Sequence, residues 1–343
     1  MPERNYTYYD FTLSLCPDCL RRVDAKIVFE DEKVYMLKNC KEHGRSKVLI
    51  ADDIEYYKNI RNYNKASEYP KTFNTKTHYG CPYDCGLCPD HEQHSCLTVV
   101  EVTDRCNLTC PTCYAGSSPT YGRHRTLEEI KKMLDTIVKN EGEPDVVQLS
   151  GGEPTIHPQF FEIMDYAKTL PIRHLMLNTN GIRIANDPEF VAQLAELNPG
   201  FEVYLQFDSL NEKALKTIRG VNLSTTRKNA LAALDAHGIS TTLVCVIQKG
   251  VNDDEVDKII NFAQQFSCVR GVTFQPIEQA GRHDKVANHR ITLSEIRQSI
   301  IEGDNPFQAQ DMIPLPCHPE NISIGYGLKQ NNEILPVTGM IPK

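Results

Sequence analysis

Residues 97–114 read LTVVEVTDRCNLTCPTCY and place three cysteines directly after a β-rich segment. Leu97–Thr103 has the branched and apolar residues of a buried strand. Cys106, Cys110 and Cys113 therefore lie on a loop at the carboxyl end of that strand. Three thiolates can hold a four-iron cluster and leave one iron open, and an open coordination position is typical of catalytic metal sites.

Strand and helix patterns alternate along the chain after this loop. Expected strands cover residues 97–103, 146–149, 174–177, 201–207, 241–247 and 272–275, and expected helices cover residues 126–138, 158–170, 188–197, 212–218, 226–237 and 253–266. Such alternation predicts parallel strands with helices outside. The expected fold class is α/β, a partial (βα)6 TIM-like barrel, in which the chemistry collects at the carboxyl ends of the strands.

Polar motifs follow several of these strands. Gly151 and Gly152 would allow a close approach of the backbone to a ligand, and Glu153 offers a hydrogen-bond acceptor. Asn178-Thr179-Asn180-Gly181 follows the third strand, and Asp208 follows the fourth. Each motif alone is more typical of a turn than of a site. On the same edge as the three-cysteine loop, they indicate one functional site.

Composition excludes several classes of protein. The chain has 343 residues, a net charge of −8 and thirteen cysteines, and its 40% hydrophobic and 24% charged shares are those of a globular protein. It shows no apolar run near the roughly 18 residues of a transmembrane helix and no apolar signal segment at its start, so we expect a cytoplasmic protein without a membrane span. The acidic balance argues against nucleic acid as a partner. In a reducing compartment, thirteen thiols indicate metal binding rather than disulfides.

Two further cysteine groups precede the barrel. Residues 1–60 contain a strand-turn-strand pattern between two metal-binding turns, or knuckles, which carry Cys16 with Cys19 and Cys40 with His43. We expect a zinc-ribbon or rubredoxin-like module in which these four residues hold a structural zinc, with a redox iron as the alternative. Residues 61–96 supply four more thiolates, and we expect an auxiliary [4Fe–4S] cluster, with a second zinc knuckle as the alternative, on Cys81, Cys85, Cys88 and Cys96.

The motif Cys106-x3-Cys110-x2-Cys113-Tyr114, with Gly151-Gly152-Glu153-Pro154 one βα unit later, resembles the radical S-adenosylmethionine (SAM) superfamily with a MoaA-like core. The resemblance implies a [4Fe–4S] cluster that cleaves bound SAM to a 5′-deoxyadenosyl radical, which attacks an unactivated C–H bond. It implies cluster ligands at the three cysteines and SAM contacts at Tyr114, Gly151, Gly152, Glu153, Thr179, Asn180 and Asp208. The same cysteine spacing at Cys81 is followed by Pro89 instead of an aromatic residue, so we do not expect SAM there.

The N-terminal knuckle followed by GCPYDCGLCP at residues 80–89 resembles a narrower group, which contains class D pterin-methylating radical SAM methyltransferases and tetraether lipid synthases. This resemblance implies methylation or C–C bond formation on a small-molecule or lipid substrate, and a low-potential electron donor such as ferredoxin or flavodoxin. We expect the substrate pocket to be bordered by Phe207, Phe274, Gln275, Glu278, Arg282 and His283.

The remaining assignments concern the domain layout and the other classes of function. We expect the core to cover residues 97–302 and a C-terminal extension to cover residues 303–343. Members of the group are usually longer than this chain, so we expect the extension to be truncated. Cys317 is either a ligand without partners or a loop thiol, and core packing is expected for Cys245 and Cys268. The alternative is an iron–sulfur protein that transfers electrons or serves as a scaffold. Closed four-ligand sites would suffice for such a protein, so the open three-cysteine site argues against it. A zinc-finger module that binds nucleic acid is supported by the first cysteine group alone. No catalytic side chain is assigned.

Overall fold

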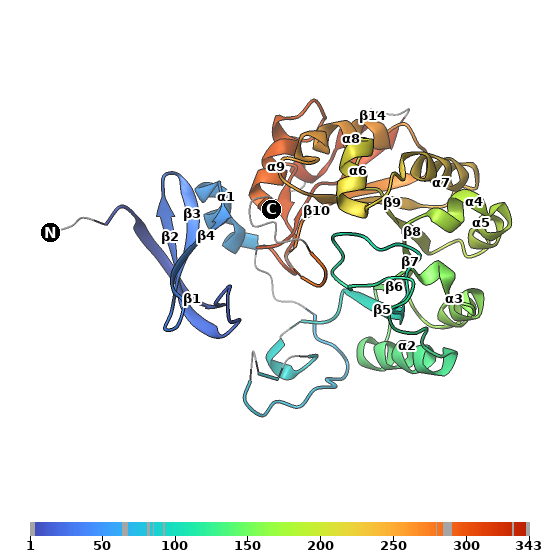
Figure 1. Ribbon diagram of the computed structural model, residues 1–343, viewed down its shortest axis with the longest axis horizontal. Helices are drawn as coiled ribbons and strands as arrows, with labels where there is room; N and C mark the ends of the chain where they lie inside the picture. The colour runs from blue at the N-terminus through green and yellow to red at the C-terminus, as the bar shows by residue number, and fades with distance from the viewer. Residues whose placement is uncertain are drawn as a thin grey trace. The chain divides into compact units, whose positions relative to one another are not determined.

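The computed structural model describes residues 4–63, 68–80, 83–84, 86–91, 93–278, 280–283, 290–330 and 333–340 (Figure 1). These residues form two compact units, which we treat separately. One unit contains Met1–Lys65, Ile291–Leu328 and Leu335–Lys343, and the other contains Ala66–Arg290 and Lys329–Ile334. Helix α9 (Leu293–Glu302) belongs to the first unit. The expected domain boundaries at residues 60, 96 and 302 stay predictions.

The first unit begins with an antiparallel sheet in the order β1-β2-β3-β4. Its strands are β1 (Thr7–Leu15), β2 (Arg22–Glu30), β3 (Lys33–Cys40) and β4 (Gly44–Ala51), followed by α1 (Ile54–Asn59). The side chains of Ile27, Val34 and Ala51 form its buried core. The expected hairpin is the β2–β3 pair, and the sequence pattern missed β1 and β4 because their apolar side chains are partly exposed.

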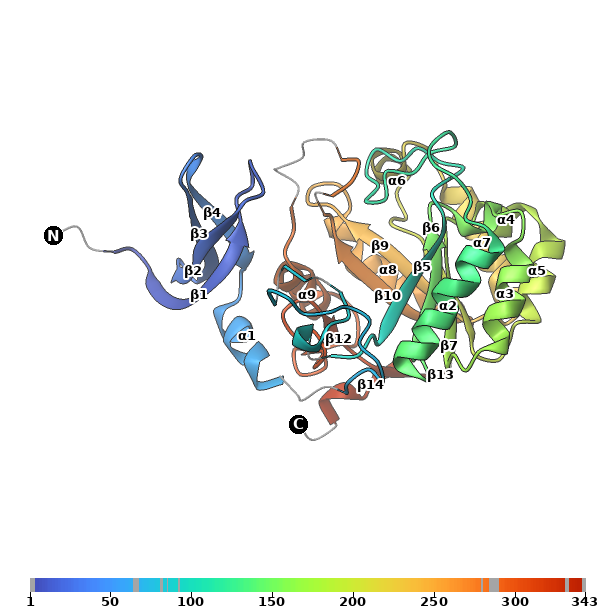
Figure 2. The same ribbon diagram turned by 90° about the horizontal axis from the view of Figure 1, so that it is seen from below.

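The second unit contains a six-stranded parallel sheet in the order β10-β9-β8-β7-β6-β5. Its strands are β5 (Leu97–Thr103), β6 (Val146–Gly151), β7 (His174–Thr179), β8 (Phe201–Gln206), β9 (Thr241–Ile247) and β10 (Val269–Pro276). Its helices are α2 (Leu127–Glu141), α3 (Phe160–Thr169), α4 (Ile182–Asn186), α5 (Pro188–Ala195), α6 (Glu212–Arg219), α7 (Ser224–Ala236) and α8 (Val256–Ala263). Figure 2 shows α2, α3, α5 and α7 on the outer side of this sheet. The expected partial (βα)6 barrel with an N-terminal cysteine-rich module is confirmed.

The two faces of the sheet differ in chemistry. In β8, Val203 and Leu205 are fully buried, whereas Tyr204 and Gln206 are partly exposed on the other face. Leu205 packs towards helix α7, because its side chain and Ala230 of α7 both lie beside Gly181. The helices therefore cover the apolar face, and the polar face lines the inside of the partial barrel.

Short elements complete the structure. These are the 3-10 turns Ile60–Tyr63, Pro89–His91, Pro154–Ile156, Asp253–Glu255 and Thr338–Met340, and the strand pairs β11 (Ile313–Pro314) with β12 (Ser323–Ile324) and β13 (Gly327–Gln330) with β14 (Glu333–Pro336). The five-residue helix α4 was not predicted, because it is too short to show a helical period. Within the part of the chain that the structure describes, no helix has the length and apolar character needed to cross a bilayer.

Candidate functional site

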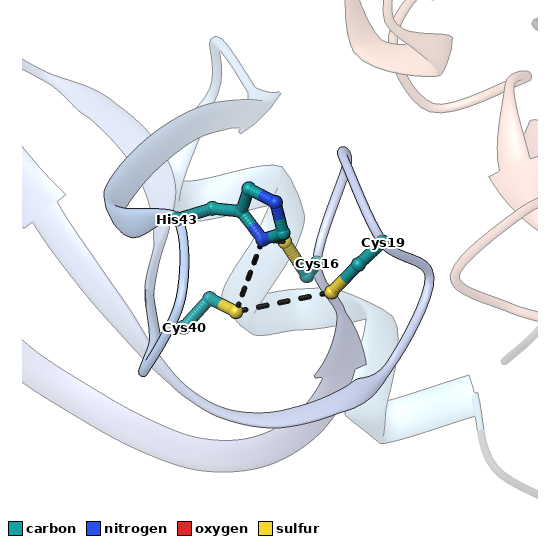
Figure 3. A group of neighbouring side chains, drawn as sticks. All are labelled: Cys16, Cys19, Cys40 and His43. Atoms are coloured by element: carbon teal, nitrogen blue, oxygen red, sulfur yellow. Dashed lines mark hydrogen bonds between the residues drawn. The ribbon is translucent and has the colours of Figure 1, made fainter.

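The first cysteine group converges on one point of the N-terminal sheet (Figure 3). The four side chains come from the β1–β2 turn and the β3–β4 turn, and their ligand atoms lie within 4.8 Å of one another: Cys16, Cys19, Cys40 and His43. The His43 Nδ1 atom lies 3.5 Å from Cys40 Sγ, and this hydrogen bond is the main reason why the pKa of Cys40 falls to about 6. Three thiols and one imidazole suit a closed tetrahedral zinc site.

The three-cysteine loop follows β5, as the sequence predicts. Cys106 and Cys110 are buried and Cys113 is partly exposed. Burial raises the pKa of Cys106 to about 12, and the charges of Glu153, Cys110 and Cys113 act in the same direction, so the three thiols lie within electrostatic range of one another. Buried thiols grouped on one loop fit an iron cluster, because iron replaces their protons with coordinate bonds.

The two glycines after β6 allow the main chain to approach the loop between β5 and α2 that carries Cys106, Cys110 and Cys113, which we call the cluster loop. A Cβ atom on Gly151 would lie 2.2 Å from the Thr103 carbonyl oxygen, and one on Gly152 would lie 2.1 Å from the Arg105 carbonyl oxygen. The backbone N–H of Gly152 donates to Thr103 at 2.8 Å, and that of Glu153 donates to Arg105 at 2.9 Å. The neighbouring main chain therefore occupies the space that a side chain at either glycine would need, and a ligand contact at these glycines stays a prediction.

The Glu153 carboxylate joins the ends of β6 and β7. Its Oε1 atom accepts hydrogen bonds from the hydroxyls of Thr155 at 2.6 Å and Thr179 at 2.8 Å, and its Oε2 atom accepts from the Asn180 N–H at 2.8 Å. Burial raises the pKa of Glu153, and these hydrogen bonds oppose that effect. Asn180 Nδ2 also donates to Asn107 Oδ1 at 2.7 Å. Asn180 therefore contacts the cluster loop directly, and the Glu153 carboxylate, with Thr179 bonded to it, supports the loop through Asn180.

Asp208 is fully buried and lies between two arginines that the sequence analysis missed. Its carboxylate accepts from Arg219 Nε at 2.8 Å and from Arg227 Nη2 at 2.5 Å. Burial alone would raise the pKa of Asp208, but the charges of Arg219 and Arg227 outweigh it and lower the pKa. Arg219 also lowers the pKa of Cys110, against the larger effect of burial, through its charge and a hydrogen bond. The cluster loop is thus tied to this ion-pair network.

A chain of hydrogen bonds crosses the polar face of the sheet from this network. Arg219 Nη2 donates to Gln206 Oε1 at 2.9 Å, and Gln206 Nε2 donates to Asn178 Oδ1 at 2.9 Å. Asn178 Nδ2 then donates to Ser150 Oγ at 2.9 Å, and Ser150 hydrogen-bonds Tyr114. Asn178 and Gln206 are amide residues within otherwise apolar strands, and this sequence feature could have revealed the chain of hydrogen bonds.

The other predicted site residues lie apart from these networks or fall outside the residues that the structure describes. Cys81 and Cys85 lie outside the described residues, Cys88 is buried and Cys96 is exposed, so their common cluster stays a prediction. Cys245 and Cys268 are buried, as expected of core residues.

Two residues expected at the substrate pocket have other roles. Phe207 is buried and stacks on Phe262, with ring centres 5.4 Å apart. The Arg282 guanidinium bonds main-chain carbonyls of the cluster loop, the nearest being that of Cys110 at 2.7 Å and that of Ser117 at 2.7 Å. Phe207 thus packs in the core and Arg282 bonds the cluster loop, and their place beside a substrate stays a prediction.

Comparison with known proteins identifies the class of this fold and site. Residues 100–263 match the radical SAM superfamily, and residues 8–52 match the HMPTM N-terminal zinc ribbon domain. The chain therefore carries a radical SAM domain, and a zinc ribbon domain precedes it in the sequence.

Among curated proteins, the chain is 37% identical over 311 residues to the 7,8-dihydro-6-hydroxymethylpterin dimethyltransferase of Methanocaldococcus jannaschii, which covers 89% of this chain and 61% of that protein. It is 30% identical over 192 residues to the GTP 3′,8-cyclase of Marinobacter nauticus, with 54% and 56% covered. The solved structure of Streptococcus suis SuiB aligns with a TM-score of 0.46 and 18% identity, over 56% of this chain and 42% of that one. The chain thus spans less than two thirds of each of these relatives.

Proposed function

We propose that this chain is an enzyme that cleaves SAM reductively at a [4Fe–4S] cluster held by Cys106, Cys110 and Cys113. The grouping of these thiols on a loop bonded to the ends of β6 and β7, in a radical SAM domain, carries the proposal. When bound, the cluster supplies the electron that cleaves the sulfonium and so generates a 5′-deoxyadenosyl radical. Glu153 and Asn180 hold the loop in place. An electron-transfer protein would not require a site with only three thiolates.

The SAM contacts are assigned by motif and position. We place Tyr114 near the adenine, Gly151 to Glu153 near the methionyl amino group, and Thr179, Asn180 and Asp208 near the ribose or carboxylate. The backbone carbonyls of the β6 loop suit an amino group better than the Glu153 carboxylate, which already accepts four hydrogen bonds. The N–H groups of Gly152 and Glu153 already donate to Thr103 and Arg105.

The radical modifies an unactivated C–H bond of a pterin-like small molecule, by methylation or by C–C bond formation. The methanogen relative named as a pterin dimethyltransferase supports this substrate class. The amides of Asn178 and Gln206 and the Tyr204 hydroxyl support it further, because they make the inner face of the partial barrel polar, and a polar face suits a pterin ring better than a hydrocarbon chain.

The other metal sites serve the same enzyme. The zinc ribbon binds a structural zinc at Cys16, Cys19, Cys40 and His43, and the thiols of Cys81, Cys85, Cys88 and Cys96 hold an auxiliary cluster that relays electrons. A ferredoxin or flavodoxin supplies the electrons. Because such clusters need a reducing compartment, we assign the enzyme to the cytoplasm.

The test is anaerobic reconstitution with iron and sulfide, reduction by dithionite in the presence of SAM, and chromatography for 5′-deoxyadenosine. The wild-type chain should form 5′-deoxyadenosine, Cys106→Ala should not, and Cys268→Ala should behave like the wild type. A wild type that loads iron but cleaves no SAM, or a Cys106→Ala variant that still cleaves it, would refute the assignment.

The substrate is tested separately with SAM, reductant and a folate-type one-carbon donor present, because the SAM that yields 5′-deoxyadenosine keeps its methyl group on methionine. We expect 7,8-dihydro-6-hydroxymethylpterin to increase 5′-deoxyadenosine formation and to change in mass. A saturated ether lipid in detergent should do neither. Consumption of the lipid in place of the pterin would replace the substrate class and leave the SAM chemistry intact.

A further inference from the structure

Arg282 lies after β10 and bonds the cluster loop more extensively than any sequence pattern suggested. Its Nε atom donates to the Cys110 carbonyl at 2.7 Å, its Nη1 to the Gly116 carbonyl at 3.1 Å and its Nη2 to the Ser117 carbonyl at 2.7 Å. Its backbone also pairs with Cys113, with N–H to O distances of 2.9 and 2.8 Å in the two directions. One residue thus makes five hydrogen bonds to the segment from Cys110 to Ser117.

The residue before Arg282 is shaped for this contact. Gly281 has a φ of +66°, and a Cβ atom on it would lie 2.0 Å from the Tyr114 carbonyl oxygen. Any other residue there would push the β10 loop away from the cluster loop. Gly281 therefore allows the main-chain pairing, and Arg282 holds it.

The chemistry of the contact requires a guanidinium. Three carbonyl oxygens converge on three nitrogens of one planar cation, an arrangement that a lysine ammonium cannot reproduce. The side chain is partly buried, so these bonds compete weakly with water. Among the residues that the structure describes, the guanidinium bonds main-chain oxygens, as a residue that holds a loop in place does.

We propose that Arg282 is the positioning residue of the cluster loop: it holds Cys110, Cys113 and Tyr114 in the geometry that cluster and SAM require. This inference rests on the proposed SAM chemistry. The β10 loop and the cluster loop, far apart in sequence, then form one rigid rim at the carboxyl ends of the first and last strands of the sheet.

The test compares Arg282→Ala, Arg282→Lys and Gly281→Ala with the wild type in the full, reconstituted chain. We expect SAM cleavage to fall about 100-fold in all three, because a displacement of about 1 Å costs that much. The electron paramagnetic resonance spectrum of the reduced cluster should lose its response to added SAM. Guanidinium chloride at concentrations far below denaturing should partly restore Arg282→Ala but not Gly281→Ala, in which the Arg282 side chain is still present.

Arg173→Ala is the matched control, because Arg173 bonds carboxylates at the surface and should be dispensable. Circular dichroism and urea unfolding check that each variant is folded, and Arg282→Lys carries the test if Arg282→Ala is insoluble. Normal cleavage and a normal SAM response in the Arg282 variants would overturn the inference, as would a loss of activity with the SAM response intact and no guanidinium rescue. A wild type without any cleavage would instead refute the proposed function.

Discussion

The carboxylate of Glu153 accepts the backbone N–H of Asn180 at 2.8 Å, across the gap between the ends of β6 and β7. Asn180 in turn donates from its side chain to Asn107 on the cluster loop at 2.7 Å. A single buried acid thereby connects two strand ends to the loop that carries the cluster cysteines. The position of those cysteines depends on this acceptor being intact.

Replacing Glu153 with glutamine should lower both stability and SAM cleavage. The new NH2 group would face either the Asn180 N–H or the Thr155 N–H, neither of which can accept, and an unsatisfied buried donor costs about 1–3 kcal/mol. Urea unfolding of the iron-free chain measures the loss of unfolding free energy. The exposed Glu162→Gln serves as control and should change stability by less than about 0.5 kcal/mol. Equal stability of the two variants would contradict this role.

Gly152→Ala should separate the β6 loop from the cluster loop. Its Cβ atom would meet the Arg105 carbonyl at 2.1 Å, and overpacking of this kind costs about 1–3 kcal/mol. The control is Gly271→Ala in the same sheet, whose nearest neighbour is the movable Thr242 hydroxyl at 3.1 Å. The free energy of unfolding, measured with denaturant, and the iron content should both fall in Gly152→Ala. Both should stay near the wild-type values in Gly271→Ala. Full iron loading in Gly152→Ala would show that the loop tolerates displacement.

Asp208→Asn should be among the most destabilising single changes. It leaves Arg219 and the fully buried Arg227 without their counter-charge, and breaking a buried pair costs about 3–5 kcal/mol. The exposed Asp254–Lys258 pair provides the comparison, because Asp254→Asn should cost at most about 1 kcal/mol. Calorimetry or urea unfolding distinguishes the two. Similar losses would mean that the arginines find other partners.

Loss of zinc should unfold the N-terminal sheet alone. Cys16→Ala removes one of four ligands from a small module whose core contains few buried side chains, so its fold depends on the metal. Hydrogen exchange measured by mass spectrometry should show loss of protection in β1 to β4, with β5 to β10 unchanged. Cys268→Ala should keep its zinc and the protection of the N-terminal sheet. Protection of β1 to β4 in zinc-free protein would show that the sheet folds without metal.

The start of helix α2 should lose stability in acid. A bidentate contact with Arg123 and the backbone N–H of Thr126 lower the pKa of Glu129 from its ordinary 4.5 to about 2. An acid whose pKa is lower in the folded state than in the unfolded state stabilises the fold at pH values above the unfolded-state pKa. That contribution disappears as the pH falls towards 2. The stability difference between wild type and Glu129→Gln should therefore be full at pH 7 and shrink below about pH 4.5. A difference independent of pH would assign the effect to packing.

The order of strands and helices and the location of the site could be predicted from sequence. Strand β5 was predicted to the residue, and the Thr126 capping box marked the start of α2, because period and capping are local properties. The knuckle ligands were also predictable, since two hairpin turns bring close pairs of ligands together.

The sequence by itself determined the class of fold, the three-cysteine loop and the edge of the sheet at which it lies. Only the tertiary structure showed that Gly152 lies against the Arg105 carbonyl, that Asp208 lies between Arg219 and Arg227, and that Arg282 donates hydrogen bonds to the cluster loop. These relationships join residues from different βα units. Their physical basis is burial and hydrogen-bond geometry between distant segments, which leaves no periodic pattern along the chain.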